Sequence, residues 1–154
     1  MLSERFSILI RAQPDYIFPF VGDLLRHQEW TSDQVEFESF TSGPIRVGGQ
    51  YRSTAHFKGM IIKAELKVKE YQPPKRFAFT VVDRTGQYEH IFTLEPENGG
   101  TRVVREIHAE DTPLSRILHV ILYPLLIKPE ANKALQLLKK KVEQNYAQVG
   151  SGAG

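Results

Sequence analysis

The chain has 154 residues, of which 41% are hydrophobic, and its formal net charge is +2 at pH 7. This length is typical of one domain with its own core, the small net charge argues against nucleic-acid binding, and the lack of cysteine excludes disulfides and thiolate chemistry. We expect one domain over residues 1–147 and a flexible, glycine-rich tail over 148–154. The amino terminus lacks the basic and apolar run of a signal peptide, so a cytoplasmic location is expected.

The amino-terminal part is expected to form a strand and then two short helices. Phe6, Ile8 and Ile10 recur at every second position, as on one face of a strand. The stretch 13–30 combines turn residues with apolar ones and predicts two short helices. Trp30 at the end of this stretch is expected to fill the interface between the helices and the sheet. A second strand is expected over 34–40.

Five strand-like segments follow in close succession, and they carry the clearest pattern in the sequence. From 60 to 68, apolar residues at even positions alternate with mostly charged residues at odd positions, which is typical of a half-buried antiparallel strand. Glycine and proline turns separate the segments, which are expected at 51–57, 60–71, 76–83, 87–94 and 101–109. Connections this short favour an up-and-down meander, because parallel strands need longer crossovers.

A long carboxy-terminal helix is expected to begin with Pro113 in its first turn. Its first part, 114–126, is apolar over a wide arc and is expected to be a buried core helix. It is too short to span a membrane, which takes about 20 apolar residues. Pro124 and Pro129 are expected to kink or briefly interrupt the helix, and a narrower apolar stripe follows them.

Several familiar site patterns are incomplete in this sequence. Residues 43–50 have the glycine spacing of a phosphate loop but lack its Lys-Ser/Thr pair and the helix that should follow, so no nucleotide site is expected. His27 and His108 each precede a glutamate by two residues, without the spacing of a zinc site, and are expected to be ordinary surface residues. No nucleophile elbow occurs, and no metal or cofactor is expected.

The order of the elements and several short motifs resemble the START-like (SRPBCC) superfamily, and within it the polyketide cyclase/dehydrase and lipid-transport group. The motifs are the opening 12–18, Trp30, Val47-Gly48-Gly49, the stretch 70–77, Leu94-Glu95-Pro96 with 99–103, and Leu138-Lys139 with Glu143. The resemblance covers Phe6 to about Tyr146. It implies an α+β helix-grip fold, in which a bent seven-stranded antiparallel sheet clasps the carboxy-terminal helix around an apolar pocket. It does not imply one chemistry, because this fold hosts carriers, cyclases, co-chaperones and quinone-binding proteins.

Polar residues on the apolar strand faces are the candidate functional residues. Tyr88 and His90 share a strand face with Phe92, so they face the cavity if Phe92 does. A cavity with apolar walls and a few polar groups suits an amphipathic molecule. The residues expected to bind the ligand are Tyr51, Phe57, Ile62, Leu66, Phe77, Phe79, Val81, Tyr88, His90, Phe92, Arg105, Leu118 and Leu122.

Arg105 depends on the register of the last strand. It lies inward if Val103 and Ile107 do, although Val104 makes this register ambiguous. An unpaired buried guanidinium is costly, so an inward Arg105 would need water, an anionic ligand or an inward carboxylate such as Asp83.

Three functions are compatible with these features. The leading hypothesis is a non-catalytic protein that binds or transports a small hydrophobic or amphipathic molecule: a lipid, a polyketide-like aromatic or an isoprenoid quinone. The alternative is an enzyme of the aromatase/cyclase type in which His90 and Tyr88 move protons, although a lone histidine on an apolar face is more often a core residue. A protein-binding adaptor is the third, but the charged outer face of 60–71 argues against a strong apolar interface. Both a monomer and a homodimer fit the sequence.

Overall fold

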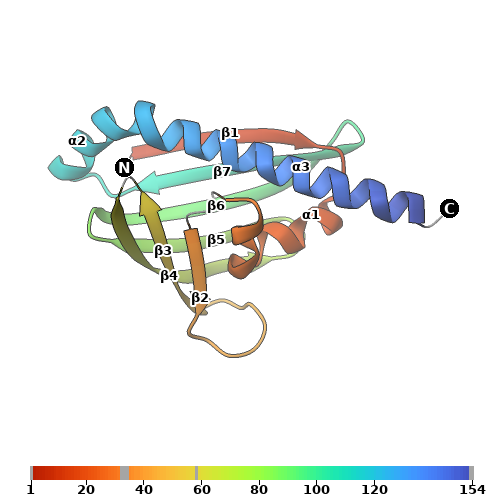
Figure 1. Cartoon of the computed structure of the whole chain (residues 1–154), viewed down its shortest axis with the longest axis horizontal. Coiled ribbons are helices and arrows are strands. Elements are labelled where there is room, and N and C mark those ends of the chain that lie inside the picture. Colours follow the sequence, from red (N-terminus) through yellow and green to blue (C-terminus); the bar gives the residue numbers. More distant parts are fainter. Residues whose placement is uncertain (1, 32–34, 58, 153–154) are drawn as a thin grey trace.

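Seven antiparallel strands form one curved sheet, in the spatial order β1-β7-β6-β5-β4-β3-β2 (Figure 1). The computed structural model describes residues 2–31, 35–57 and 59–152. Consecutive strands from β2 to β7 are neighbours, which confirms the predicted meander; Gln34, expected to open the second strand, lies outside the described residues. The strands are β1 (Leu2–Ile10), β2 (Val35–Ser39), β3 (Gln50–Phe57), β4 (Met60–Gln72), β5 (Arg76–Asp83), β6 (Gly86–Glu97) and β7 (Gly100–Ala109).

Two short helices connect β1 to β2, as predicted: α1 (Pro14–Val21) and the 3-10 helix η1 (Leu24–Glu29). Pro14 occupies the first turn of α1, where its missing N–H costs nothing. Asp23 caps η1, because its Oδ1 accepts a hydrogen bond from the backbone N–H of Leu25 at 3.0 Å. The indole N–H of Trp30, which follows η1, donates to the carbonyl of Phe20 at 3.0 Å, and the side chain is fully buried. This confirms that Trp30 fills the interface with the sheet.

The carboxy-terminal helix consists of three parts: α2 (Pro113–Leu122), the π-helical turn η2 (Tyr123–Ile127) and α3 (Lys128–Gly152). Thr112 and Ser115 form a reciprocal capping box at the start of α2. The interruption expected from Pro124 is the π-helical turn. Helix α3 continues to Gly152, into the stretch 148–154 that the sequence predicted as a flexible tail; residues 153–154 lie outside the described chain.

Helix α3 lies along the concave inner face of the sheet (Figure 1). Its buried stripe confirms the amphipathic pattern and consists of Ala131, Ala134, Leu135, Leu138 and Val142. Polar contacts fix the position of α3 along β1. Lys139 Nζ donates to the Leu9 carbonyl at 2.9 Å, and Glu143 Oε1 accepts from the Arg11 N–H at 3.0 Å.

Helix α2 does not match the predicted buried core helix. Val120 is 73% exposed and Leu125, in the following η2 turn, is 71% exposed. The helix lies at the end of the sheet where β1 begins and β7 ends (Figure 1). Other large apolar side chains on this segment are also exposed: Leu114, Ile117, Ile121 and Ile127. In the described part of the chain, no helix is long and apolar enough to cross a membrane.

Candidate functional site

The inner face of the sheet is closed at one end and partly open at the other. On β4 the exposed fraction rises from Val68 (1%) through Ala64 (6%) to Met60 (49%). The same change occurs along β5, β6 and β7, where buried residues give way to half-buried ones toward α2. We call the half-buried inner-face residues next to α2 the open half. They are Ile62, Val81, Tyr88, His90, Arg105 and Ile107.

Side chains of the protein itself fill the closed half. His27 on η1 is 3% exposed and packs against Trp30 at a ring-centroid distance of 4.5 Å. Its ring also makes edge contacts with four phenylalanines: Phe37, Phe77, Phe79 and Phe92. The expectation that His27 is a surface residue is therefore wrong. Local sequence could not show this, because the sheet that covers His27 comes from later parts of the chain.

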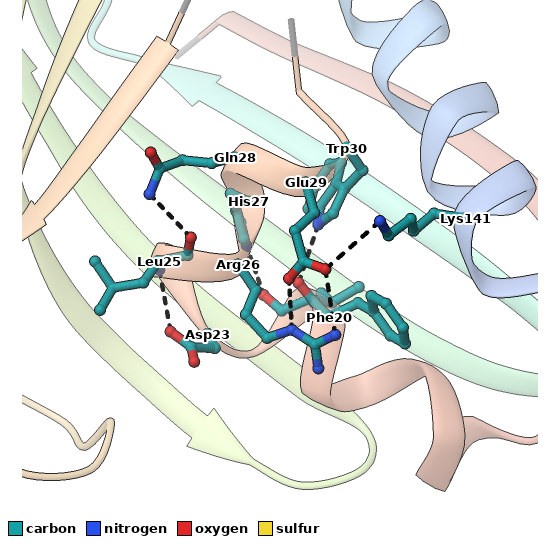
Figure 2. A network of polar contacts seen from close by, with 10 residues as sticks. Phe20, Asp23, Leu25, Arg26, His27, Gln28, Glu29, Trp30 and Lys141 are labelled. Carbon is teal, nitrogen blue, oxygen red and sulfur yellow. Dashed lines mark hydrogen bonds and ion pairs between the residues drawn. The ribbon is translucent and has the colours of Figure 1, made fainter. Parts of the chain in front are cut away.

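Polar contacts link η1 to the end of α1 and to α3 (Figure 2). Glu29 accepts a hydrogen bond from Arg26 Nε at 2.7 Å, and its carboxylate lies 4.0 Å from Lys141 Nζ on α3. His27 Nε2 donates to the Val21 carbonyl at 2.7 Å, so the buried ring has a satisfied donor. Burial lowers the pKa of His27 to about 3, which keeps the imidazole neutral.

The predicted ligand-binding residues divide between the two halves. Five of them are buried in the hydrophobic core, namely Tyr51, Leu66, Phe77, Phe79 and Phe92. Five others belong to the open half: Ile62, Val81, Tyr88, His90 and Arg105. Leu118 is half-buried on α2, and the side chains of Phe57 and Leu122 lie outside what the structure describes. The structure thus brings together a small accessible group with polar side chains, next to a packed aromatic core.

Arg105 points inward from β7, as the register of Val103 and Ile107 predicted. It lies opposite Phe92 on β6 and Phe6 on β1, both of which are buried. The guanidinium carbon is 5.4 Å from the centre of the Phe92 ring. Its Nη2 donates to His90 Nδ1 at 3.1 Å, while its Nε is shielded from solvent and has no hydrogen-bond partner among the described residues. Burial lowers the pKa of Arg105 to about 10, so the group is still charged at neutral pH.

Asp83, which the sequence suggested as a partner for Arg105, serves the β5–β6 turn instead. Its Oδ1 accepts hydrogen bonds from the N–H of Thr85 at 2.7 Å and from the Thr85 hydroxyl at 2.5 Å. The Thr85 hydroxyl also lies 2.5 Å from the hydroxyl of Tyr88. The Tyr88 hydroxyl is therefore held at the turn, at the rim of the open half.

His90 is stacked on Phe79, with a ring-centroid distance of 5.0 Å and an interplanar angle of 20°. Burial, followed by the charge of Arg105 and the proximity of His27, lowers the pKa of His90 well below its ordinary value. The ring is therefore neutral at physiological pH. Because a guanidinium can only donate, His90 Nδ1 accepts from Arg105 and the ring proton resides on Nε2.

The sequence did not predict the side-chain contacts that attach α2 to β1. His119 Nε2 lies 3.0 Å from Glu4 Oε1, and the His119 ring stacks on Tyr123 at 4.9 Å. Burial and the neighbouring Glu4 raise the pKa of Tyr123 to about 12. These residues are far apart in sequence and follow no motif, so the sequence carried no signal for them.

A separate crevice of about 450 Å³ lies at the opposite end of the sheet, between α1, η1 and the β4–β5 turn. It is lined by side chains that include Asp15, Asp23, Phe18 and Tyr71. We place the candidate site at the open half instead. The open half combines apolar walls with an incompletely satisfied cation, whereas the crevice is formed largely by helix ends and a proline turn.

The antiparallel seven-stranded sheet that encloses a long carboxy-terminal helix defines a helix-grip protein of the START-like superfamily. The family model described as polyketide cyclase/dehydrase and lipid transport matches residues 1–143, so the chain belongs to this family. The resemblance seen in the sequence motifs is confirmed. No curated protein matches the sequence.

Solved structures show the same fold at low sequence identity. A protein from Thermus thermophilus is 22% identical, with a TM-score of 0.72 over 92% of this chain and 97% of the other. A protein from Nitrosomonas europaea is 15% identical, with a TM-score of 0.74 over 95% and 97% of the two chains. Ara h 8.0201 is 16% identical, with a TM-score of 0.69 over 92% and 97%.

Proposed function

We propose that the protein binds or transports a small hydrophobic or amphipathic molecule on the open half of its inner face. The observation that carries the proposal is the change from buried to half-buried residues along β4 to β7, which leaves apolar and polar side chains accessible side by side. Ile62, Val81 and Ile107 would cover the carbon skeleton, and burial stabilises such contact by about 25 cal/mol per Å² of apolar area. Tyr88, His90 and Arg105 would orient the polar end.

The family supports hydrophobic ligand binding in general, since its description includes lipid transport. Within that class we propose a lipid, a polyketide-like aromatic or an isoprenoid quinone as the ligand. A cytoplasmic location remains the expectation from the sequence, and imaging of a tagged protein would test it.

Native mass spectrometry of the purified protein tests the proposal, by comparison with spectra under denaturing conditions. The informative variant is Val81→Arg, which places a charged side chain on the inner face. Val82→Arg is the matched control, because Val82 is the next residue of β5 and is 47% exposed on the outer face. A small-molecule adduct is expected in the native protein and in Val82→Arg, and it should be missing in Val81→Arg.

Two outcomes would contradict the proposal. One is an adduct that Val81→Arg retains at the wild-type level. The other is a native protein that carries no adduct even after incubation with a lipid extract of the cells that produced it.

The cyclase alternative has support from the family description but less from the geometry. His90 Nδ1 already accepts a hydrogen bond from Arg105, which leaves no free lone pair on the neutral ring to act as a base. Tyr88 hydrogen-bonds Thr85 instead of His90. His90→Gln separates the two functions, because a carrier should keep most of its ligand binding, whereas a proton-transfer enzyme should lose most of its turnover of a polyketide-type substrate.

A further inference from the structure

We infer that the open half recognises a carboxylate head group on its ligand, and that Arg105 is the residue that binds it. This inference rests on the proposed function, because it assigns the polar end of the molecule whose apolar part contacts Ile62, Val81 and Ile107. The ligand is therefore expected to be an apolar chain or ring system that ends in a carboxylic acid.

The argument begins with the incomplete hydrogen bonding of Arg105. A guanidinium has five N–H donors. One is used by His90 Nδ1, and Nε has no partner among the described residues although it is shielded from solvent. Buried donors are nearly always satisfied, so an unused one at a partly accessible cation indicates that an acceptor is missing.

The surrounding charges do not supply that acceptor. Asp83 is bonded to Thr85 in the β5–β6 turn. Glu4, on the inner face of β1 opposite Ile107, pairs with His119 of α2. The polar group in contact with Arg105 is His90, a neutral base, and the ring of Phe92 contributes a further, weaker attraction for the cation. Arg105 is therefore a positive charge on a largely apolar surface, without a carboxylate partner in the described structure.

The chemistry of the site selects a carboxylate over a neutral polar group. A guanidinium and a carboxylate match in geometry, and charge-assisted hydrogen bonds are about twice as strong as neutral ones. The low polarity of the surroundings strengthens the attraction further. His90 adds a donor, because the bond from Arg105 leaves its proton on Nε2. The two side chains together offer donors and no acceptor, as an anion requires.

The test measures the preference for an acid over its uncharged ester. The probes are cis-parinaric acid and methyl cis-parinarate, whose fluorescence rises on transfer to an apolar site and which differ only in the head group. Binding is measured for the native protein, Arg105→Met, Arg105→Lys and Arg102→Met. Arg102 is the matched control, because it lies on the same strand but pairs with Glu97, with Nη2 and Oε1 2.8 Å apart.

We expect the native protein and Arg102→Met to bind the acid at least about tenfold more tightly than the ester, as a charge-assisted contact predicts. Arg105→Met should reduce this preference to less than about threefold, because it lowers the affinity for the acid while the affinity for the ester stays constant or rises. Arg105→Lys should give an intermediate preference, because it keeps the charge and loses the planar fork.

Equal binding of acid and ester by the native protein would overturn the carboxylate assignment and leave the proposed function standing. An unchanged preference for the acid in Arg105→Met would show that Arg105 does not bind the carboxylate. This result too would leave the proposed function standing. Binding of neither probe by the native protein would count against both the assignment and the proposed function.

Discussion

Nη2 of Arg105 and Nδ1 of His90 lie 3.1 Å apart on the neighbouring strands β7 and β6. This contact determines the protonation state of the ring, because only the tautomer with the proton on Nε2 can accept at Nδ1. It also links the one inward-facing arginine of β7 to the histidine at the centre of the open half. Each member of the pair also packs on an aromatic ring: His90 stacks on Phe79, and Arg105 lies over Phe92.

The tautomer of His90 can be measured directly. Nitrogen-15 NMR of the native protein at pH 7 should show a neutral ring protonated at Nε2, and the ring should remain neutral at pH 6 because its pKa is lowered by burial. In Arg105→Met the constraint on the tautomer is lost and a mixture should appear. A ring that carries its proton on Nδ1 in the native protein would contradict the assigned hydrogen bond.

Arg105 is expected to reduce the stability of the fold. Removing the charge in Arg105→Met should raise the free energy of unfolding by up to about 2 kcal/mol, because an incompletely satisfied cation no longer has to be desolvated. The measurement is urea denaturation in the absence of ligand. Arg102→Met should leave the free energy of unfolding almost unchanged, since its ion pair with Glu97 is on the surface. Destabilisation by Arg105→Met would show that Arg105 is a structural residue.

Stability should fall as the pH is lowered from 7 to 5. Burial lowers the pKa of both His27 and His90, so near pH 6 the unfolded chain binds more protons than the folded protein. The stabilisation by these neutral rings is complete above the unfolded pKa, about 6.5, and is lost as the pH decreases toward the folded value, which is about 3 for His27. Each ring can contribute up to about 1.4 kcal/mol per pH unit.

Urea denaturation at pH 7, 6 and 5 measures this slope. His90→Phe should reduce it, and His56→Gln is the matched control because His56 is exposed on β3. The same slope in His90→Phe and in the native protein would show that His90 is protonated in the folded state over this range.

Glu143 is expected to hold α3 in place along β1. Its Oε1 accepts from the Arg11 N–H at 3.0 Å and from Lys139 Nζ at 2.9 Å. Glu143→Ala should lower the free energy of unfolding by about 1 kcal/mol, because it removes the acceptor of the Arg11 N–H and one of the two partners of Lys139, which keeps its bond to the Leu9 carbonyl. Glu130→Ala, at an exposed position of α3, is the control and should have little effect. Hydrogen exchange at the Arg11 amide provides a local readout, and unchanged protection in Glu143→Ala would contradict the assigned bond.

The two parts of the carboxy-terminal helix should respond differently to substitution. Leu138 on α3 is fully buried, and Leu138→Ala should cost about 2 to 5 kcal/mol of stability. Val120 on α2 is 73% exposed, and Val120→Ala should change stability by less than about 0.5 kcal/mol. Thermal denaturation of the two variants checks the difference. A large loss in Val120→Ala would show that α2 packs against a surface that the structure leaves open.

The sequence by itself determined the strands, the meander of the consecutive strands after the short helices, and which side chains share a face. Period-two alternation in β4 and tight turns between the strands are local signals, and they led to the correct meander. The inward direction of Arg105 also followed from the strand period, once Val103 and Ile107 were taken as inward. The short motifs were sufficient for the family, which the match over residues 1–143 confirms.

Only the tertiary structure decided how far each face is covered. Periodicity indicates the direction of a side chain, but solvent exposure depends on what packs against it from distant parts of the chain. His27 is therefore buried although its local sequence is polar, and Val120 is exposed although its local sequence is apolar. The partner of Asp83, by contrast, is a local one that the sequence could have indicated, because an Asp side chain in a turn often accepts a hydrogen bond from the backbone two residues further on. The open half is likewise a tertiary feature, because the same alternating strands are buried at one end of the inner face and half-buried at the other.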